Sequence, residues 1–203
     1  MSGTLAWALV ALGLAVVVIR RRSLAVALVT AQALVLVGYA LYQASTGEEF
    51  AAAGALCVRA IVLAAVFLLL VSRTRETRPV RARIAPLTRG GVAVAAGLAL
   101  TWLVPAIGLT SRDAERAVLA LVAFGCTAVA TRRATLFQVL GIVLVENALA
   151  LAALELPGGA SLTVELGVAL DLVFIAVVAA VFHERIFAEF GAGDTAALRV
   201  LRD

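Results

Sequence analysis

Three charged residues, Arg59, Glu146 and Asp171, stand in the middle of long apolar runs of this 203-residue chain. A charge near the middle of a membrane-crossing helix is unfavourable by several kcal/mol unless it is paired or hydrated, so such residues are candidates for function. Apolar surroundings favour the neutral form of a carboxyl group, which lets it exchange protons near neutral pH, and a nearby Arg opposes that effect. The pattern therefore predicts a proton or ion relay.

The three charges are predicted to lie in one layer, because their depths from the ends of their runs agree within roughly 2 Å. Polar residues that could assist them lie on the same runs or near the end of one. The predicted relay set is Glu146, Asp171, Arg59, Glu165, Gln138 and Asn147. The alternative is a buried ion pair between Arg59 and one acid that only fixes packing. Two acids weigh against it, because one Arg cannot compensate both.

Composition indicates a membrane protein. Hydrophobic residues make up 64% of the chain, charged residues only 15%, and the mean hydropathy is +1.09. A soluble domain of this size needs more charge on its surface. All 17 basic residues are Arg and the net charge is +4. These arginines lie between the apolar runs, which is typical of membrane topology rather than of a nucleic-acid site.

Seven apolar runs approach the roughly 20 residues that a helix needs to cross a bilayer. We expect an all-α, polytopic membrane bundle of about seven transmembrane helices, with the first and fifth runs the shortest. Thr110 and Asp113 have capping-box spacing, which supports a helix start before the fifth run. The expected spans are Leu5–Ile19, Leu24–Tyr42, Ala51–Val71, Gly90–Leu109, Ala114–Ala130, Ala134–Leu154 and Leu162–Phe182.

The arginines also predict an orientation. With seven crossings, the connections alternate between the two sides, and the arginine-rich ones fall on the same side as the tail. The positive-inside rule then puts the amino terminus outside and the carboxyl terminus in the cytoplasm. The first run is followed, not preceded, by Arg20–Arg22, which is the wrong order for a cleaved signal peptide.

The chain divides into five predicted units with a partial internal repeat. A shift of about 112 residues places Arg59 opposite Asp171, so each half contains a helix triplet with a central charge on its third member, as in many transport folds. The units are a three-helix unit (1–72), an Arg-rich cytoplasmic loop (73–89), two linking helices (90–130), a helix pair with the two acids (131–185) and a cytoplasmic tail (186–203).

The remaining polar residues carry weaker predictions. Glu155 is expected to be solvated and Tyr39 to belong to an outer aromatic belt. Glu165, near the outer mouth of the last span, is equally compatible with a solvated residue and with a group where protons enter. His183 is expected to face the carboxyl-terminal end of its helix. Two isolated cysteines predict no disulfide, metal or cofactor site, and no catalytic residue is expected.

The carboxyl-terminal third resembles a known family. Gln138, the segment 145–147 (Val-Glu-Asn), the segment 156–158 (Leu-Pro-Gly) and the run from Val164 to Asp171 are similar to component E of hydrogenase-4 and formate hydrogenlyase-type complexes. The tail 193–202 resembles that family's ending. Arg59 stands where members of the family often carry Lys, which favours an electrostatic role for it.

The resemblance implies an integral subunit of a membrane-bound, complex I-related oxidoreductase in a prokaryotic cell membrane. Component E is similar over its last three helices to the K-type subunit of complex I and the C-type subunit of multisubunit Na⁺/H⁺ antiporters. The residues that match the K-type arrangement are the basic pair Arg132 and Arg133, Glu146 and Asp171. The match implies that Glu146 and Asp171 belong to a chain of ionisable groups. Other membrane subunits and lipid are the implied partners, without nucleic acid.

Two other functions remain open at the level of the sequence. The chain could be the small subunit of a cation/proton antiporter, or a structural scaffold whose midplane charges only fix helix packing. C-type antiporter subunits usually have about half this length and three spans, which favours the hydrogenase-type complex.

Overall fold

The computed structural model is all-α, as predicted, and describes residues 3–74, 84–156 and 162–190; the side chains at 73–74, 162–165, 186 and 188–190 lie outside this description. The described residues form seven helices. They are α1 (Gly3–Val18), α2 (Arg22–Gln43), α3 (Gly47–Thr74), α4 (Pro86–Leu103), α5 (Arg112–Thr131), α6 (Thr135–Glu155) and α7 (Leu162–Phe190). Most of the predicted loop 73–89 and tail 186–203 lies outside the described residues.

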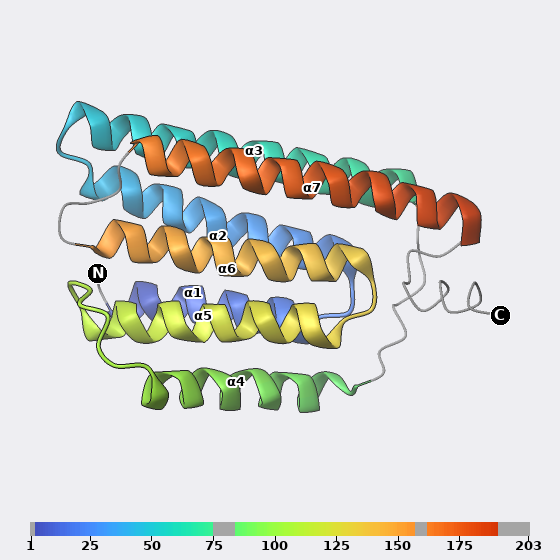
Figure 1. The fold of residues 1–203 in the computed structure, drawn as a ribbon, viewed down its shortest axis with the longest axis horizontal. Coiled ribbons are helices and arrows are strands. Elements are labelled where there is room, and N and C mark those ends of the chain that lie inside the picture. Colours follow the sequence, from blue (N-terminus) through green and yellow to red (C-terminus); the bar gives the residue numbers. More distant parts are fainter. Residues whose placement is uncertain (1–2, 75–83, 157–161, 191–203) are drawn as a thin grey trace.

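The helices pack in three rows of two, with α4 outermost. Figure 1 shows α3 beside α7, α2 beside α6 and α1 beside α5, and contacts within and between these rows form the bundle. Consecutive helices alternate in direction, so the two members of each row run parallel. The 112-residue shift pairs these same helices, which makes the bundle two parallel triplets side by side.

Five of the seven helices are long and apolar enough to cross a bilayer: α2, α3, α5, α6 and α7. The 16 residues of α1 and the 18 of α4 span about 24 and 27 Å, short of a hydrocarbon core of about 30 Å. The fifth run, predicted to be among the shortest, qualifies, whereas the fourth does not. The chain has the helix lengths and the apolar composition of a polytopic membrane protein.

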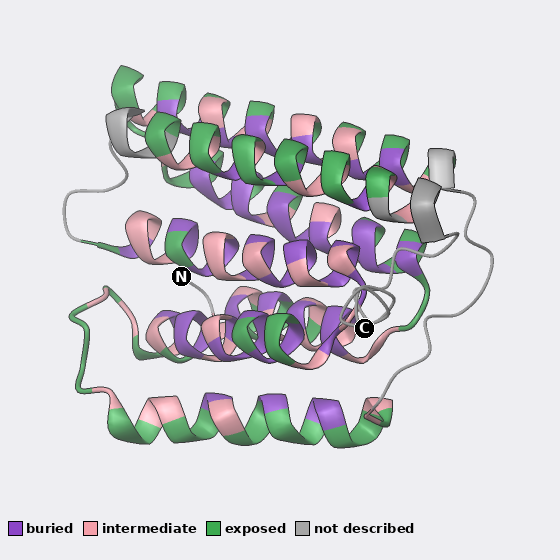
Figure 2. Ribbon diagram, turned by 45° about the vertical axis from the view of Figure 1, so that its right-hand side comes forward, coloured by how far each residue is buried: buried purple, intermediate pink, exposed green. Residues whose placement is uncertain are grey.

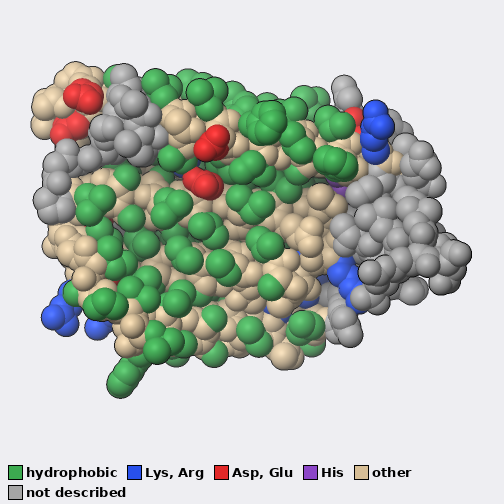
Figure 3. All heavy atoms as spheres, in the orientation of Figure 1, with side chains coloured by type: hydrophobic (Ala, Val, Ile, Leu, Met, Phe, Trp, Pro, Cys, Tyr) green, Lys and Arg blue, Asp and Glu red, His purple; other side chains and the backbone are tan. Residues whose placement is uncertain are grey.

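The distribution of side chains on the molecular surface is also that of a membrane protein. Figure 3 shows hydrophobic side chains along the length of one face, with most charged side chains gathered towards the two ends. One end carries basic residues and is called the arginine end; its described members include Arg20, Arg22, Arg89 and Arg132. The other is called the opposite end. Exposed charges at the arginine end, such as Arg20, lie where water and lipid headgroups can solvate them. Arg22, Arg89 and Arg132 are instead buried.

The starts of α5 and α4 are among those that differ from the sequence prediction. α5 begins after Ser111, whose hydroxyl accepts a hydrogen bond of 3.1 Å from the backbone N–H of Ala114. The predicted N-cap, Thr110, is therefore wrong by one residue. The hydroxyl of Thr110 instead donates a hydrogen bond to Glu155 of α6. α4 begins with Pro86, which is favourable in a first turn because the missing N–H has no intrahelical acceptor there.

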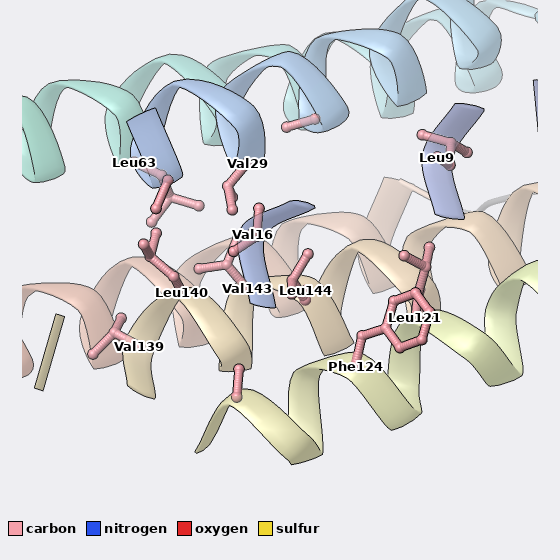
Figure 4. Packing of buried hydrophobic residues seen from close by; sticks show 14 of the residues in the cluster. Leu9, Val16, Val29, Leu63, Leu121, Phe124, Val139, Leu140, Val143 and Leu144 are labelled. Carbon is pink, nitrogen blue, oxygen red and sulfur yellow. The ribbon is translucent and has the colours of Figure 1, made fainter. Parts of the chain in front are cut away.

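The core runs through all rows and is tightest between α5 and α6. Figure 2 shows buried residues concentrated on α2, α5 and α6, and Figure 4 shows how apolar side chains of these helices pack with Leu9 and Val16 of α1 and Leu63 of α3. A Cβ at Gly125 would lie 2.5 Å from the carbonyl oxygen of Gly141, and one at Gly141 would lie 2.8 Å from that of Gly125. Small residues let two helix backbones approach this closely in a membrane.

Replacing Gly125 by Ala should therefore destabilise the bundle by about 1–3 kcal/mol, because the added methyl group meets backbone that cannot move aside. Gly54→Ala is the matched control, since nothing lies within 4 Å of its Cβ position. Thermal unfolding in detergent should show a lower midpoint for Gly125→Ala only. Equal midpoints for the two variants would contradict the close contact.

Candidate functional site midway along the bundle

The structure brings the three midplane charges together from three helices. Arg59 on α3 is buried, Glu146 on α6 is half-buried and Asp171 on α7 is exposed. Glu146 interacts electrostatically with both Arg59 and Asp171. The carboxylate of Glu146 thus has one neighbour that stabilises its charge and one that opposes it, which is a suitable arrangement for a group that gains and loses a proton.

Asp171 lies on the outer surface of α7. Its neighbours Leu170 and Phe174 are 71% and 70% exposed. In Figure 3, acidic atoms lie over α7 midway between the two ends, within an otherwise apolar face. A charged side chain in the middle of a bilayer is unfavourable by about 2.5–3.5 kcal/mol on insertion scales. The position of this carboxylate is therefore unusual for a surface that faces only lipid.

Asn147 takes part in a buried hydrogen-bond chain between central helices. Its amide nitrogen donates to the side-chain oxygen of Gln32 at 3.0 Å, and the amide nitrogen of Gln32 donates to the carbonyl oxygen of Leu9 at 3.0 Å. Both amides are at most 1% exposed. These hydrogen bonds join α6, α2 and α1 directly beside Glu146. Asn147 therefore has a structural contact in addition to its predicted place in the relay.

Gln138 and Glu165 are not part of this layer as the structure describes it. The Gln138 amide donates to the carbonyl oxygen of Arg132 at 3.0 Å, at the arginine end. Eight residues separate it from Glu146, which is about 12 Å along a helix. Glu165 belongs to α7, but its side chain lies outside the described residues.

A second polar cluster, not foreseen from the sequence, lies at the opposite end. Glu155 is 0% exposed, so the expectation that it is solvated is wrong. Its two carboxylate oxygens accept hydrogen bonds from the hydroxyl groups of Tyr39 and Thr110. Tyr39 is 8% exposed and also accepts a 2.8 Å hydrogen bond from Gln43, so it does not belong to an aromatic belt.

The sequence did contain a signal for this cluster. Tyr39 follows Gln32 by seven residues on α2, and Glu155 follows Asn147 by eight residues on α6. Both steps are close to two helical turns, so the second pair lies near the same face as the first. Two polar residues about two turns apart on each of two helices predict a row of polar contacts between those helices.

The arginine end is stabilised by contacts to the end of α1. The guanidinium groups of Arg89 and Arg132 donate to the carbonyl oxygen of Val17 at 3.1 and 2.8 Å, and Arg132 also donates to that of Ile19. Carbonyl groups at a helix end lack intrahelical partners and favour nearby cations. The ring of Phe137 lies 4.0 Å from the Arg132 guanidinium. Burial, together with the charges of Arg89 and Arg20, lowers the pKa of Arg132 to about 9.

His183 is buried rather than facing the end of its helix. It is 1% exposed and lies near Phe67 of α3 and Thr135 at the start of α6. Among the described residues, neither ring nitrogen has a hydrogen-bond partner, and the Thr135 hydroxyl also lacks one. The expected contact with the carboxyl-terminal end of α7 is therefore replaced by packing between three helices.

Other features of the described residues do not add to the site. No group of three His, Cys, Asp or Glu side chains suited to a metal occurs among them. A groove of about 560 Å³ lies between α1, α4 and α5, and its lining includes Trp7, Trp102 and Phe124. None of the predicted relay residues lines this groove.

The chain is similar to the uncharacterized protein Rv0085 of Mycobacterium tuberculosis (strain ATCC 25618 / H37Rv). The two are 33% identical over an alignment of 122 residues, which covers 57% of this chain and 56% of the mycobacterial protein. The chain thus spans little more than half the length of that relative. No protein-family model and no solved structure matches the chain.

Replacing Tyr39 by Phe should destabilise the protein by about 1–3 kcal/mol, because a buried carboxylate loses a donor. Tyr42→Phe is the matched control, since Tyr42 is 87% exposed on the same helix. Thermal unfolding in detergent should separate the two variants. A Tyr39→Phe protein as stable as the control would contradict the buried cluster.

Replacing Arg132 by Lys should also destabilise the protein, because a single ammonium group cannot reproduce the planar guanidinium that reaches two carbonyl groups and covers an aromatic ring. We expect about 1–3 kcal/mol from the weakened charged hydrogen bonds. Arg21→Lys serves as the control, because Arg21 is exposed at the same end. Unfolding midpoints that fall equally in both variants would contradict a specific role for the Arg132 contacts, because lysine keeps the positive charge at both positions.

Proposed function

We propose that the chain is an integral membrane subunit of a complex I-related, membrane-bound hydrogenase-type oxidoreductase complex. In this proposal it catalyses no reaction itself and contributes ionisable groups to proton or ion translocation. The redox centres belong to other subunits of the assembly. The observation that carries the proposal is the electrostatic interaction of Glu146 with both Arg59 and Asp171, from three helices midway along an apolar bundle.

Two further points support the proposal. The resemblance to component E is carried by residues around Glu146 and Asp171, which are the same acids that the fold places near each other. Glu155 of the opposite cluster and Arg132 of the arginine end both have hydrogen-bond partners, although two nitrogen atoms of Arg132 have none among the described residues. At the midplane, one buried oxygen of Glu146 also lacks a hydrogen-bond partner among the described residues.

The proposed division of roles follows from the chemistry of the side chains. Glu146 and Asp171 exchange protons, whereas Arg59 keeps its charge and biases the neighbouring carboxylate. Gln138 lies roughly 12 Å nearer the arginine end, so water would have to connect it to Glu146. Glu165 and Asn147 complete the proposed set, the latter through its position beside Glu146.

The proposal includes an orientation and a location. The amino terminus lies outside a prokaryotic cell membrane and the arginine end faces the cytoplasm. This orientation places Arg20, Arg89 and Arg132 where the positive-inside rule requires basic residues. The arginines that contact the end of α1 therefore also serve as topology signals.

Glu146→Gln tests the relay in the assembled complex. Glutamine keeps the size of the side chain but cannot carry a proton, so the rate of proton translocation should fall by about 10²-fold or more. Asp171→Asn should lower it as well. Glu48→Gln, an exposed position at the opposite end, should leave the rate unchanged. If the rate of translocation is unchanged by both Glu146→Gln and Asp171→Asn, the relay is contradicted and the charges only fix helix packing.

The nature of the complex is tested separately by purification. Hydrogenase large and small subunits should co-purify with the tagged chain after mild solubilisation and be identified by mass spectrometry. Antiporter subunits in their place would instead support the second candidate, a small subunit of a cation/proton antiporter.

A further inference from the structure

The outer surface of α7 combines an exposed acid with a strip of exposed apolar side chains. We call this surface the Asp171 face; its residues are Leu170, Asp171, Phe174, Val177, Val178 and Val181. They recur at three- and four-residue intervals, so they lie on one side of the helix. Scattered apolar side chains suit lipid, but a carboxylate in their middle does not.

When both acids are ionised, the charges of the midplane layer do not balance among the described residues. Arg59 contributes one positive charge, and Glu146 and Asp171 contribute two negative charges, which leaves one negative charge. Arg59 is only 3% exposed and interacts with Glu146 in the interior. The unbalanced charge therefore lies at the outer surface of α7, where a neighbouring helix can reach it.

The described arginines of a second copy of this chain would not supply the missing charge. Apart from Arg59, every described arginine lies at a helix end or in a connection, as Arg112 and Arg185 illustrate. Two copies meeting symmetrically through this surface would bring one Asp171 towards the other, which is unfavourable for two negative charges. The charge pattern of the described residues therefore favours a different partner chain.

We propose that the Asp171 face binds a transmembrane helix of a different protein, which carries Lys or Arg midway along its span. The partner's apolar side chains cover Leu170 and Phe174, and its basic group pairs with Asp171. This inference rests on the proposed function only in identifying the partner as a subunit of the same complex. The pairing is an attraction in surroundings of low dielectric, where an ion pair with well-placed partners specifies one neighbour.

A photoreactive benzoylphenylalanine at Phe174 tests the proposal in native membranes, in the full-length chain. Irradiation should give one protein adduct whose cross-linked peptide belongs to an apolar span with a central Lys or Arg. Adding Asp171→Asn should lower the yield of that adduct by about tenfold or more, because the partner's charge is left unpaired. Adding Glu48→Gln should leave the yield unchanged.

Four outcomes would overturn the inference: adducts with lipid only, an adduct of twice the mass of this chain, a cross-linked span without a basic residue, or a yield that Asp171→Asn leaves unchanged. Failure of the proposed function is distinguishable. If the adduct forms and depends on Asp171 while Glu146→Gln leaves translocation intact, the interface stands and the relay does not. If only lipid adducts form and Glu146→Gln abolishes translocation, the relay stands and the interface does not.

Discussion

Polar groups in an apolar interior must find partners within the protein, and the hydrogen-bond chain from Asn147 through Gln32 to Leu9 shows how this bundle meets that constraint. It joins α6, α2 and α1 at their centres. α2 and α6 are also the middle row, in contact with helices on both sides. Because a slip of one residue would separate these amides, the hydrogen-bond chain fixes the register on which the other rows depend.

At the two ends of the bundle, buried charged groups of opposite sign also find hydrogen-bond partners within the protein. At one end Arg132 binds carbonyl groups of the first triplet, and at the other Glu155 accepts hydrogen bonds from Tyr39 and Thr110. Each contact joins segments that are far apart in the sequence. The register of α1, α2 and α6 is therefore fixed at both ends as well as at the centre, and Glu146 lies on one of these helices.

Much of the helical framework could be predicted, because long apolar runs and arginine clusters are local signals. The conspicuous midplane charges Glu146 and Asp171 could be found for the same reason. The burial of Glu155 could not be recognised locally, because a carboxylate at the end of an apolar run looks the same whether water or Tyr39 solvates it. The close approach of Gly125 and Gly141 was equally hidden, since it depends on which helices become neighbours.

The parallel arrangement of the two triplets has a consequence for the short, less apolar α4. A unit of three helices ends on the side of the bundle opposite to where it began. A second unit can run in the same direction only if the chain first returns along the full length of the bundle, and in Figure 1 that return is α4. The position of α4 thus follows from the number of helices that the chain needs to return to its starting side, rather than from core packing. This explains why it can lie at the edge, mostly exposed, and still be indispensable to the architecture.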